Sequence, residues 1–237
     1  GQPLVTKVKT LTDKPITTIV NTHTHFDHVN GNVELPGNLE IVTHVNTKTL
    51  MDQANPVTGL QTGQQRNIFK EAGGKGMPTQ TFTDKLALGQ GADQVDLYYH
   101  GRAHTSGDAW VVFPSLRVMH SGDAFAGKGL PIMDANNGGS GVAYPNTITA
   151  AAANAKELNI ETIITGHSPT TMTVADLEEF ARFTGEFVRT VQAGKKAGQT
   201  ADDVAAAWKT PAQFTGYRAT PPARVKSYVQ VIFDETK

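Results

Sequence analysis

Three imidazoles and one carboxylate lie within six consecutive residues, in the segment His23-Thr24-His25-Phe26-Asp27-His28. Imidazole nitrogens and carboxylate oxygens together suit a borderline metal such as zinc. A strand could not direct all four groups at one point, because its side chains alternate between two faces, whereas a tight loop at a strand end could. We therefore expect His23 and His25 to bind one metal ion. Asp27 and His28 would bind a second ion beside it.

Three further potential ligands follow runs that are typical of strands: His104 after 95–100, Asp123 after 116–120 and His167 after 160–165. Side chains from several strand ends can meet at one edge of a sheet, which is the usual place for an α/β active site. Any one of the three could by itself be an ordinary loop residue. The cluster at 23–28 favours the metal-ligand interpretation for all three.

The elements that would position these groups follow from the chain's turn residues and its apolar periodicity. Short β-branched or aromatic runs predict strands at 16–20, 41–44, 95–100, 109–113, 116–120 and 160–165. Capping patterns and apolar residues at helical spacing predict helices at 146–158, from 173 to about 193, at 200–208 and at 222–233. Strands interleaved with helices indicate an α/β fold. The stretches 55–78 and 127–141 are the expected long loops, where binding specificity often lies.

Composition narrows the class of protein. The 237 residues are 38% hydrophobic and 18% charged with a net charge of -1, which gives no electrostatic signature of nucleic-acid or membrane-surface binding. No apolar run is long enough to span a bilayer. The chain has no cysteine, so any metal must be held by histidine and carboxylate. Localisation stays open between periplasmic or secreted and cytoplasmic, since an upstream segment could have been removed before Gly1.

Taken in order along the chain, these motifs resemble the metallo-β-lactamase-fold superfamily. The resemblance implies an αββα sandwich, formed here by one domain over 1–237, with two metal ions between the sheets. The implied ligands are His23, His25 and His104 for one ion, Asp27, His28 and His167 for the other, and Asp123 as the bridge between them. Asp123 makes the chain most similar to the glyoxalase II, lactonase and phosphodiesterase branches, because β-lactamases generally carry cysteine or serine there.

One departure concerns the N-terminal region. Members of the superfamily usually have several strands before the histidine motif, but only 22 residues precede His23 here, and they resemble a helix end followed by a strand. The first sheet could therefore be reduced, or the chain could be a fragment. A second chain or a homo-oligomer could also complete that sheet.

The expected chemistry is hydrolysis of a small molecule. Two cations would lower the pKa of a bound water, and the resulting dinuclear metal-bound hydroxide would attack an ester, thioester, lactone or amide. Asp27 would orient that nucleophile while it binds its metal. Lys128 would meet an anionic group of the substrate, or simply face solvent. Asp108, Thr105 and Ser121 are candidates to hydrogen-bond the far nitrogens of the ligand imidazoles, whereas His44, His100 and His120 are expected to pack or to support the site.

Other functions fit the same ligands. β-Lactam hydrolysis is disfavoured by Asp123. An iron-dependent persulfide dioxygenase would use iron in place of the two expected zinc ions, and manganese is a further alternative. A binding module that holds metal without turnover is the non-enzymatic alternative. The substrate is set by the shape of the loops around the metals, so the sequence does not identify it.

Overall fold

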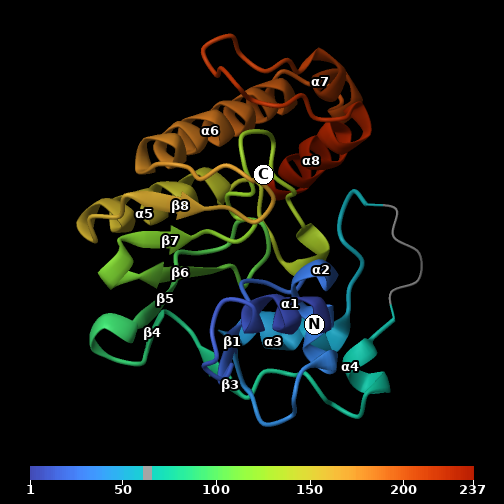
Figure 1. The fold of residues 1–237 in the computed structure, drawn as a ribbon. Helices are drawn as coiled ribbons and strands as arrows, with labels where there is room; N and C mark the ends of the chain where they lie inside the picture. Colours follow the sequence, from blue (N-terminus) through green and yellow to red (C-terminus); the bar gives the residue numbers. More distant parts are fainter. Residues whose placement is uncertain (61–65) are drawn as a thin grey trace.

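The computed structural model describes residues 1–60 and 66–237, which form two β-sheets with helices on their outer sides (Figure 1). The first sheet has three parallel strands in the order β1 (Thr18–Val20), β2 (Glu40–His44) and β3 (Gln80–Phe82). Its register pairs Ile19 with Ile41 and Thr43 with Thr81. The predicted α/β class and the αββα arrangement are confirmed.

The second sheet has five strands in sequence order: β4 (Lys85–Leu88), β5 (Val95–Tyr99), β6 (Ala109–Phe113), β7 (Val118–His120) and β8 (Thr162–Ile164). Neighbouring strands are antiparallel except for β7 and β8, which are parallel. The strands β5, β7 and β8 therefore run in one direction. Their carboxyl ends lie at the same edge of the sheet, and that edge carries the candidate ligands.

The helices are α1 (Gln2–Lys9), α2 (Phe26–Val29), α3 (Val45–Gln53), α4 (Ile68–Glu71), α5 (Tyr144–Glu157), α6 (Val174–Lys196), α7 (Ala201–Ala207) and α8 (Pro222–Glu235). Helices α5 and α6 lie on the side of the five-stranded sheet away from β1 and β3 (Figure 1). No helix within the described ranges is both long enough and apolar enough to cross a membrane.

Strand β6 shows how the sequence encodes a strand that is covered on both faces. Ala109 and Val111 pack against the first sheet, while Trp110 and Val112 pack against the helices. Because successive side chains of a strand point to opposite faces, a strand covered on both sides is apolar at every position. The run 109–113 meets that requirement, and its predicted bounds are those observed.

The long helix α6 begins as its sequence predicts. The hydroxyl of Thr173 accepts from the backbone N–H of Asp176, and the Asp176 carboxylate accepts from the backbone N–H of Thr173. This reciprocal pair satisfies amides that the first turn would leave free. Leu177, Phe180 and Phe187 on its inner face join the main core. Thr200 and Asp203 form the same capping pair at α7.

Some elements differ from the prediction. The structure adds β3, β4 and α3, which the sequence pattern did not indicate. The strand expected at 116–120 begins only at Val118, because 114–116 form a 3-10 turn and Arg117 has a left-handed backbone with φ 53°. Of the expected loop at 55–78, residues 61–65 lie outside the described ranges, and α4 forms within the remainder.

Candidate metal centre

The seven predicted ligands come from four separate segments that converge at one edge of the sandwich. His23 and His25 lie on the loop after β1, and Asp27 and His28 follow in the short helix α2. The other three follow strands of the second sheet: His104 after β5, Asp123 after β7 and His167 after β8. The structure thus brings together all seven residues that the sequence singled out.

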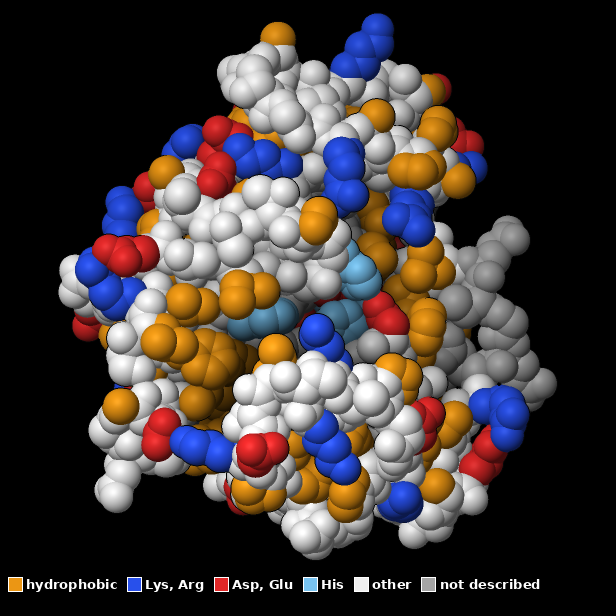
Figure 2. All heavy atoms as spheres, in the orientation of Figure 1, with side chains coloured by type: hydrophobic (Ala, Val, Ile, Leu, Met, Phe, Trp, Pro, Cys, Tyr) orange, Lys and Arg blue, Asp and Glu red, His pale blue; other side chains and the backbone are white. Residues whose placement is uncertain are grey.

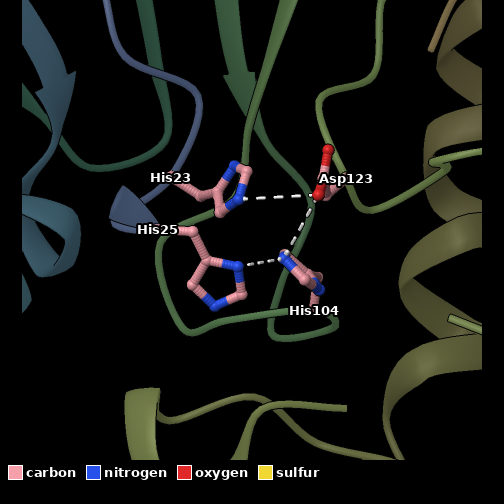
Figure 3. A group of neighbouring side chains, drawn as sticks. All are labelled: His23, His25, His104 and Asp123. Carbon is pink, nitrogen blue, oxygen red and sulfur yellow. Dashed lines mark hydrogen bonds and ion pairs between the residues drawn. The ribbon is translucent and has the colours of Figure 1, made fainter. Parts of the chain in front are cut away.

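The first group comprises His23, His25, His104 and Asp123, all buried, with one potential ligand atom from each lying within 4.8 Å of the others. Figure 3 shows these four side chains directed at a common point. His25 Nδ1 lies 3.1 Å from His104 Nε2. Asp123 Oδ2 lies 3.9 Å from His23 Nε2 and 3.8 Å from His104 Nε2.

The second group comprises Asp27, His28 and His167, and it lies nearer the solvent. Asp27 Oδ2 is 3.5 Å from His28 Nε2 and 3.3 Å from His167 Nε2. Asp123 joins the two groups, since its Oδ1 lies 3.4 Å from His28 Nε2 and its Oδ2 lies 3.0 Å from His167 Nε2. Its carboxylate therefore has the position that a bridging ligand needs.

The donor atoms of the first group fit a cation. Among the residues that the structure describes, His23 Nε2 and Asp123 Oδ1 are buried without a hydrogen-bond partner, although Asp123 Oδ1 lies 3.4 Å from His28 Nε2. Buried polar atoms rarely stay unpaired, because the lost hydration costs free energy. Burial also lowers the pKa of His23 well below its usual value and that of His104 to about 3, so both rings are neutral, the form that binds metals. The cluster could therefore hold a metal ion.

Each imidazole of the first group is fixed through its far nitrogen. With the facing nitrogens free to bind a cation, His23 Nδ1 donates to Thr22 Oγ1 at 3.0 Å, and His104 Nδ1 donates to the carbonyl of Ile132 at 2.9 Å. His25 Nε2 donates to the fully buried carboxylate of Asp134 at 2.7 Å. Such outer contacts set the tautomer and orientation of a metal-binding histidine.

Asp134 bonds a ligand imidazole, a role that the sequence did not predict for it. Asp108, Thr105 and Ser121, for which the role was predicted, make other contacts. Asp108 accepts hydrogen bonds from the backbone and hydroxyl of Thr105, and burial raises the pKa of its carboxyl to about 7. Ser121 donates to the carbonyl of Phe125. These residues shape the ligand loops, but within the described residues they do not bond the ligand imidazoles.

Two glycines let the ligand loops approach each other. A side chain at Gly166 would place its Cβ 1.9 Å from Asp123 Oδ1, so only glycine fits between His167 and that carboxylate. Gly122 has a left-handed backbone with φ 51°, and a Cβ there would meet Thr22 at 2.9 Å. The position of the Asp123 carboxylate thus depends on glycine both directly before it and beside it.

The remaining histidines lie outside the ligand set. His44 Nε2 donates to the carbonyl of Thr83 at 2.9 Å, and its ring stacks on Tyr99. His120 Nδ1 accepts from the backbone N–H of Gly122 at 3.0 Å, which supports the turn that carries Asp123. His100 packs between Tyr98 and Trp110. These contacts agree with the packing and supporting roles expected for the three.

The ligands open into a cleft of about 460 Å³. Figure 2 shows histidine and acidic side chains at the bottom of a hollow in the molecular surface. One wall is the segment 126–132, within the predicted specificity loop, and another is the segment 218–224. Lys128 points away from this lining: its Nζ lies 2.8 Å from Asp176 and 3.4 Å from Glu179 on α6. The expectation that Lys128 meets substrate has no support in this geometry.

Comparison with known proteins agrees with the fold. The family model described as "Metallo-beta-lactamase superfamily" matches residues 6–167. Similar solved structures include a metallo-beta-lactamase from Pontibacter korlensis, at 18% identity and a TM-score of 0.58, covering 78% of this chain and 76% of that one. The VMB-1 structure has 13% identity and a TM-score of 0.59, covering 78% of this chain and 74% of that one. No curated protein gave a significant match. At these identities the structural likeness shows the fold alone.

Proposed function

Since the chain belongs to the metallo-beta-lactamase superfamily, we propose that it is a metal-dependent hydrolase with a dinuclear zinc centre. The seven converging side chains would hold the two ions, with Asp123 between them. The observation that carries the proposal is a pair of buried ligand atoms, His23 Nε2 and Asp123 Oδ1, that have no hydrogen-bond partner in the described part of the chain. Both lie inside a cluster of nitrogen and oxygen ligands. The same ligands would accept iron or manganese, so zinc is the part that metal analysis must establish.

Bound cations would act as Lewis acids and lower the pKa of a coordinated water, which supplies the nucleophile near neutral pH. The chain's own groups then position the reactants. Asp27 lies at the mouth of the centre, where its carboxylate would orient the nucleophile by accepting a hydrogen bond from it. The outer bonds to Thr22, Asp134 and Ile132 keep the three buried imidazoles directed inward without further reorganisation.

The proposed substrate is a small molecule with an ester, thioester, lactone or amide bond. The cleft has a size suited to such molecules, and apolar residues from the 126–132 and 55–60 segments line it beside the ligands. We also propose that 1–237 is a single domain, because α6, α7 and α8 share the core that covers β6 and β7.

β-Lactam hydrolysis is the second candidate, favoured by the names of the solved structures with the same fold. The position of Asp123 between the two ligand groups argues against it, because the β-lactamases of this superfamily generally have cysteine or serine there. The two candidates are separable by substrate.

The test combines metal analysis with a substrate panel. Purified protein should contain two equivalents of zinc and hydrolyse at least one lactone, thioester or ester faster than a chromogenic cephalosporin. His104→Ala should abolish that hydrolysis. Stoichiometric iron with sulfur-dependent oxygen uptake would overturn the hydrolase proposal, and so would a zinc-loaded protein that turns over no member of the panel.

A further inference from the structure

The cleft wall formed by 218–224 carries two arginines, Arg218 and Arg224. Both side chains are exposed to the cleft. Arg218 lies just before α8, and Arg224 lies in its first turn. Lysine or arginine side chains border the hollow above the histidines in Figure 2. The family model ends at residue 167, so this wall comes from a part of the chain that the match does not cover.

Neither guanidinium is neutralised within the part of the chain that the structure describes. The arginines that form ion pairs there are Arg66, Arg102, Arg117 and Arg189. Among the described residues, the acidic side chains that line the cleft are Asp27 and Asp123, which belong to the candidate metal centre. As far as the structure describes it, the cleft therefore has two cationic groups without an ion pair and no further carboxylate to balance them.

Arg218 is held in place by its neighbours in the chain. Its backbone N–H donates to the carbonyl of Lys128 at 3.1 Å, while Lys128 itself is tied to α6 through Asp176. The preceding Tyr217 packs against Phe183 with ring centroids 4.2 Å apart. These two anchors fix the backbone from which the Arg218 side chain enters the cleft.

The Arg218 guanidinium also lies close to the metal ligands. A Cβ at Gly127 would be 3.3 Å from Arg218 Nη2 and 3.5 Å from Cβ of Ser168, the residue that follows His167. Gly127 thus leaves the guanidinium room beside the His167 loop. An anion bound there would lie at the rim of the proposed reaction centre, within reach of a small substrate.

We propose that Arg218 and Arg224 form an anion-binding subsite, so that the substrate carries a carboxylate or phosphate group on an apolar body. The planar guanidinium suits either anion, because its N–H groups match the oxygen spacing of both. Leu130, Pro131 and Ile132 on the facing wall would cover the apolar part. The role of this subsite in substrate binding rests on the proposed hydrolase function, but anion binding to the subsite can be measured without turnover.

The first experiment measures binding of three probes with six carbons each: hexanoate, hexyl phosphate and uncharged hexanol. Calorimetry on the purified protein should show that at least one anion binds and that hexanol binds far more weakly. In the variant with Arg218→Ala and Arg224→Ala, anion affinity should fall at least about tenfold, a change near 1.4 kcal/mol. Whichever anion binds more tightly identifies the substrate's charged group. Equal anion binding by wild type and double variant, or no anion binding by either, would overturn the subsite.

The matched control is Arg182→Ala. Arg182 is also exposed and without an ion pair in the described residues, but it lies on α6 outside the cleft, so its loss should leave anion affinity unchanged. A parallel loss in this control would contradict the assignment. Thermal melting confirms that the variants remain folded, as expected for exposed side chains.

A second readout separates this subsite from the proposed function. The ratio of kcat/KM for a carboxylate-bearing ester to that for its neutral analogue should fall about tenfold in the double variant. If the protein hydrolyses no member of the substrate panel but the double variant loses anion binding, the hydrolase proposal fails and the subsite stands. If hydrolysis is observed and the ratio is unchanged, the subsite fails and the hydrolase proposal stands.

Discussion

The two groups of the candidate metal centre, here called its halves, differ in how far the protein has arranged them in advance. The histidines of the first group are 1% to 5% exposed, and each is oriented by a hydrogen bond from outside the cluster. In the second group Asp27 is 39% and His167 is 51% exposed. No residue in the described ranges outside the centre orients the His28 or His167 ring. The side chains of the first half are thus positioned in advance. Those of the second half are open to solvent and are positioned mainly by contacts with Asp123.

This difference predicts unequal metal affinities, because binding is tighter where ligands need no reordering. The first group should retain its metal on dialysis, and the second should exchange it. The open half is also the one that substrate and water can reach. Substitutions in one half, or at Asp123 between the halves, should therefore change metal content and hydrolysis rate to different extents.

The largest effect is expected from Asp123→Asn, since this carboxylate contacts both groups. Loss of an outer contact typically costs 10- to 100-fold in metal affinity or activity, so loss of a shared ligand should cost at least about a hundredfold in both. Metal content after dialysis and the hydrolysis rate measure it. Asp202→Asn on α7, at an exposed residue paired with Lys226, is the control and should change neither.

Removing one histidine from each half should give different stoichiometries. His167→Ala should keep one tightly held equivalent of metal, because the first group is untouched. His104→Ala should lose that tight equivalent, because it removes a buried ligand and leaves His25 Nδ1 unopposed. Metal titration against a competing chelator distinguishes the two. Equal stoichiometry and equal affinity in the two variants would show that the halves are alike.

Asp134→Asn should weaken the first half selectively. The carboxylate that holds the His25 ring becomes a neutral amide, so first-site affinity should fall by about 10- to 100-fold while the second site is little affected. Asp108→Asn is the matched control, because it changes a buried aspartate that bonds Thr105 and not an imidazole. If both variants lower metal affinity equally, the Asp134 contact has no special role.

The last prediction concerns acid stability of the metal-free protein. Burial lowers the pKa of His104 to about 3 and that of His100 to about 4, so at these two rings the unfolded chain binds more protons than the folded one below pH 6.5. Their contribution to the free energy of unfolding should therefore decrease as the pH falls from about 6.5 toward 4, while the raised pKa of Asp108 acts in the opposite direction. His100→Phe should reduce that decrease by at most about 3 kcal/mol, measured by denaturant unfolding across this range. An unchanged pH slope would contradict a half-buried, neutral His100.

The parts of the site that the sequence could predict are either neighbours in the chain or follow a strand that the sequence also predicts. His23, His25, Asp27 and His28 are neighbours in the chain, and each later ligand directly follows a recognisable strand. Asp134 stands 109 residues from the ring it orients, inside a loop without periodicity, so only the folded arrangement identifies it. Lys128 likewise looked free until the fold placed it beside Asp176.

The same distinction applies to the fold. Long or strongly apolar elements such as α6 and β6 follow from periodicity and capping. The strand β3 has only three residues, and β4 is a short strand that begins with a lysine, so neither carries enough pattern to be recognised alone. They are stabilised by pairing with β2 and β5, which is tertiary information.

The buried carboxylate of Asp134 holds more than one part of the molecule. While Oδ2 accepts from His25, Oδ1 accepts from the backbone N–H of Thr58 at 2.9 Å, between Val57 and Leu60 of the cleft lining. Anything that steadies the imidazole also steadies this stretch of backbone, and thermodynamic linkage makes the relation mutual. A cation that fixes the His25 ring would therefore also favour one conformation of the 57–60 segment. A molecule that binds against this segment would in turn favour binding of the cation.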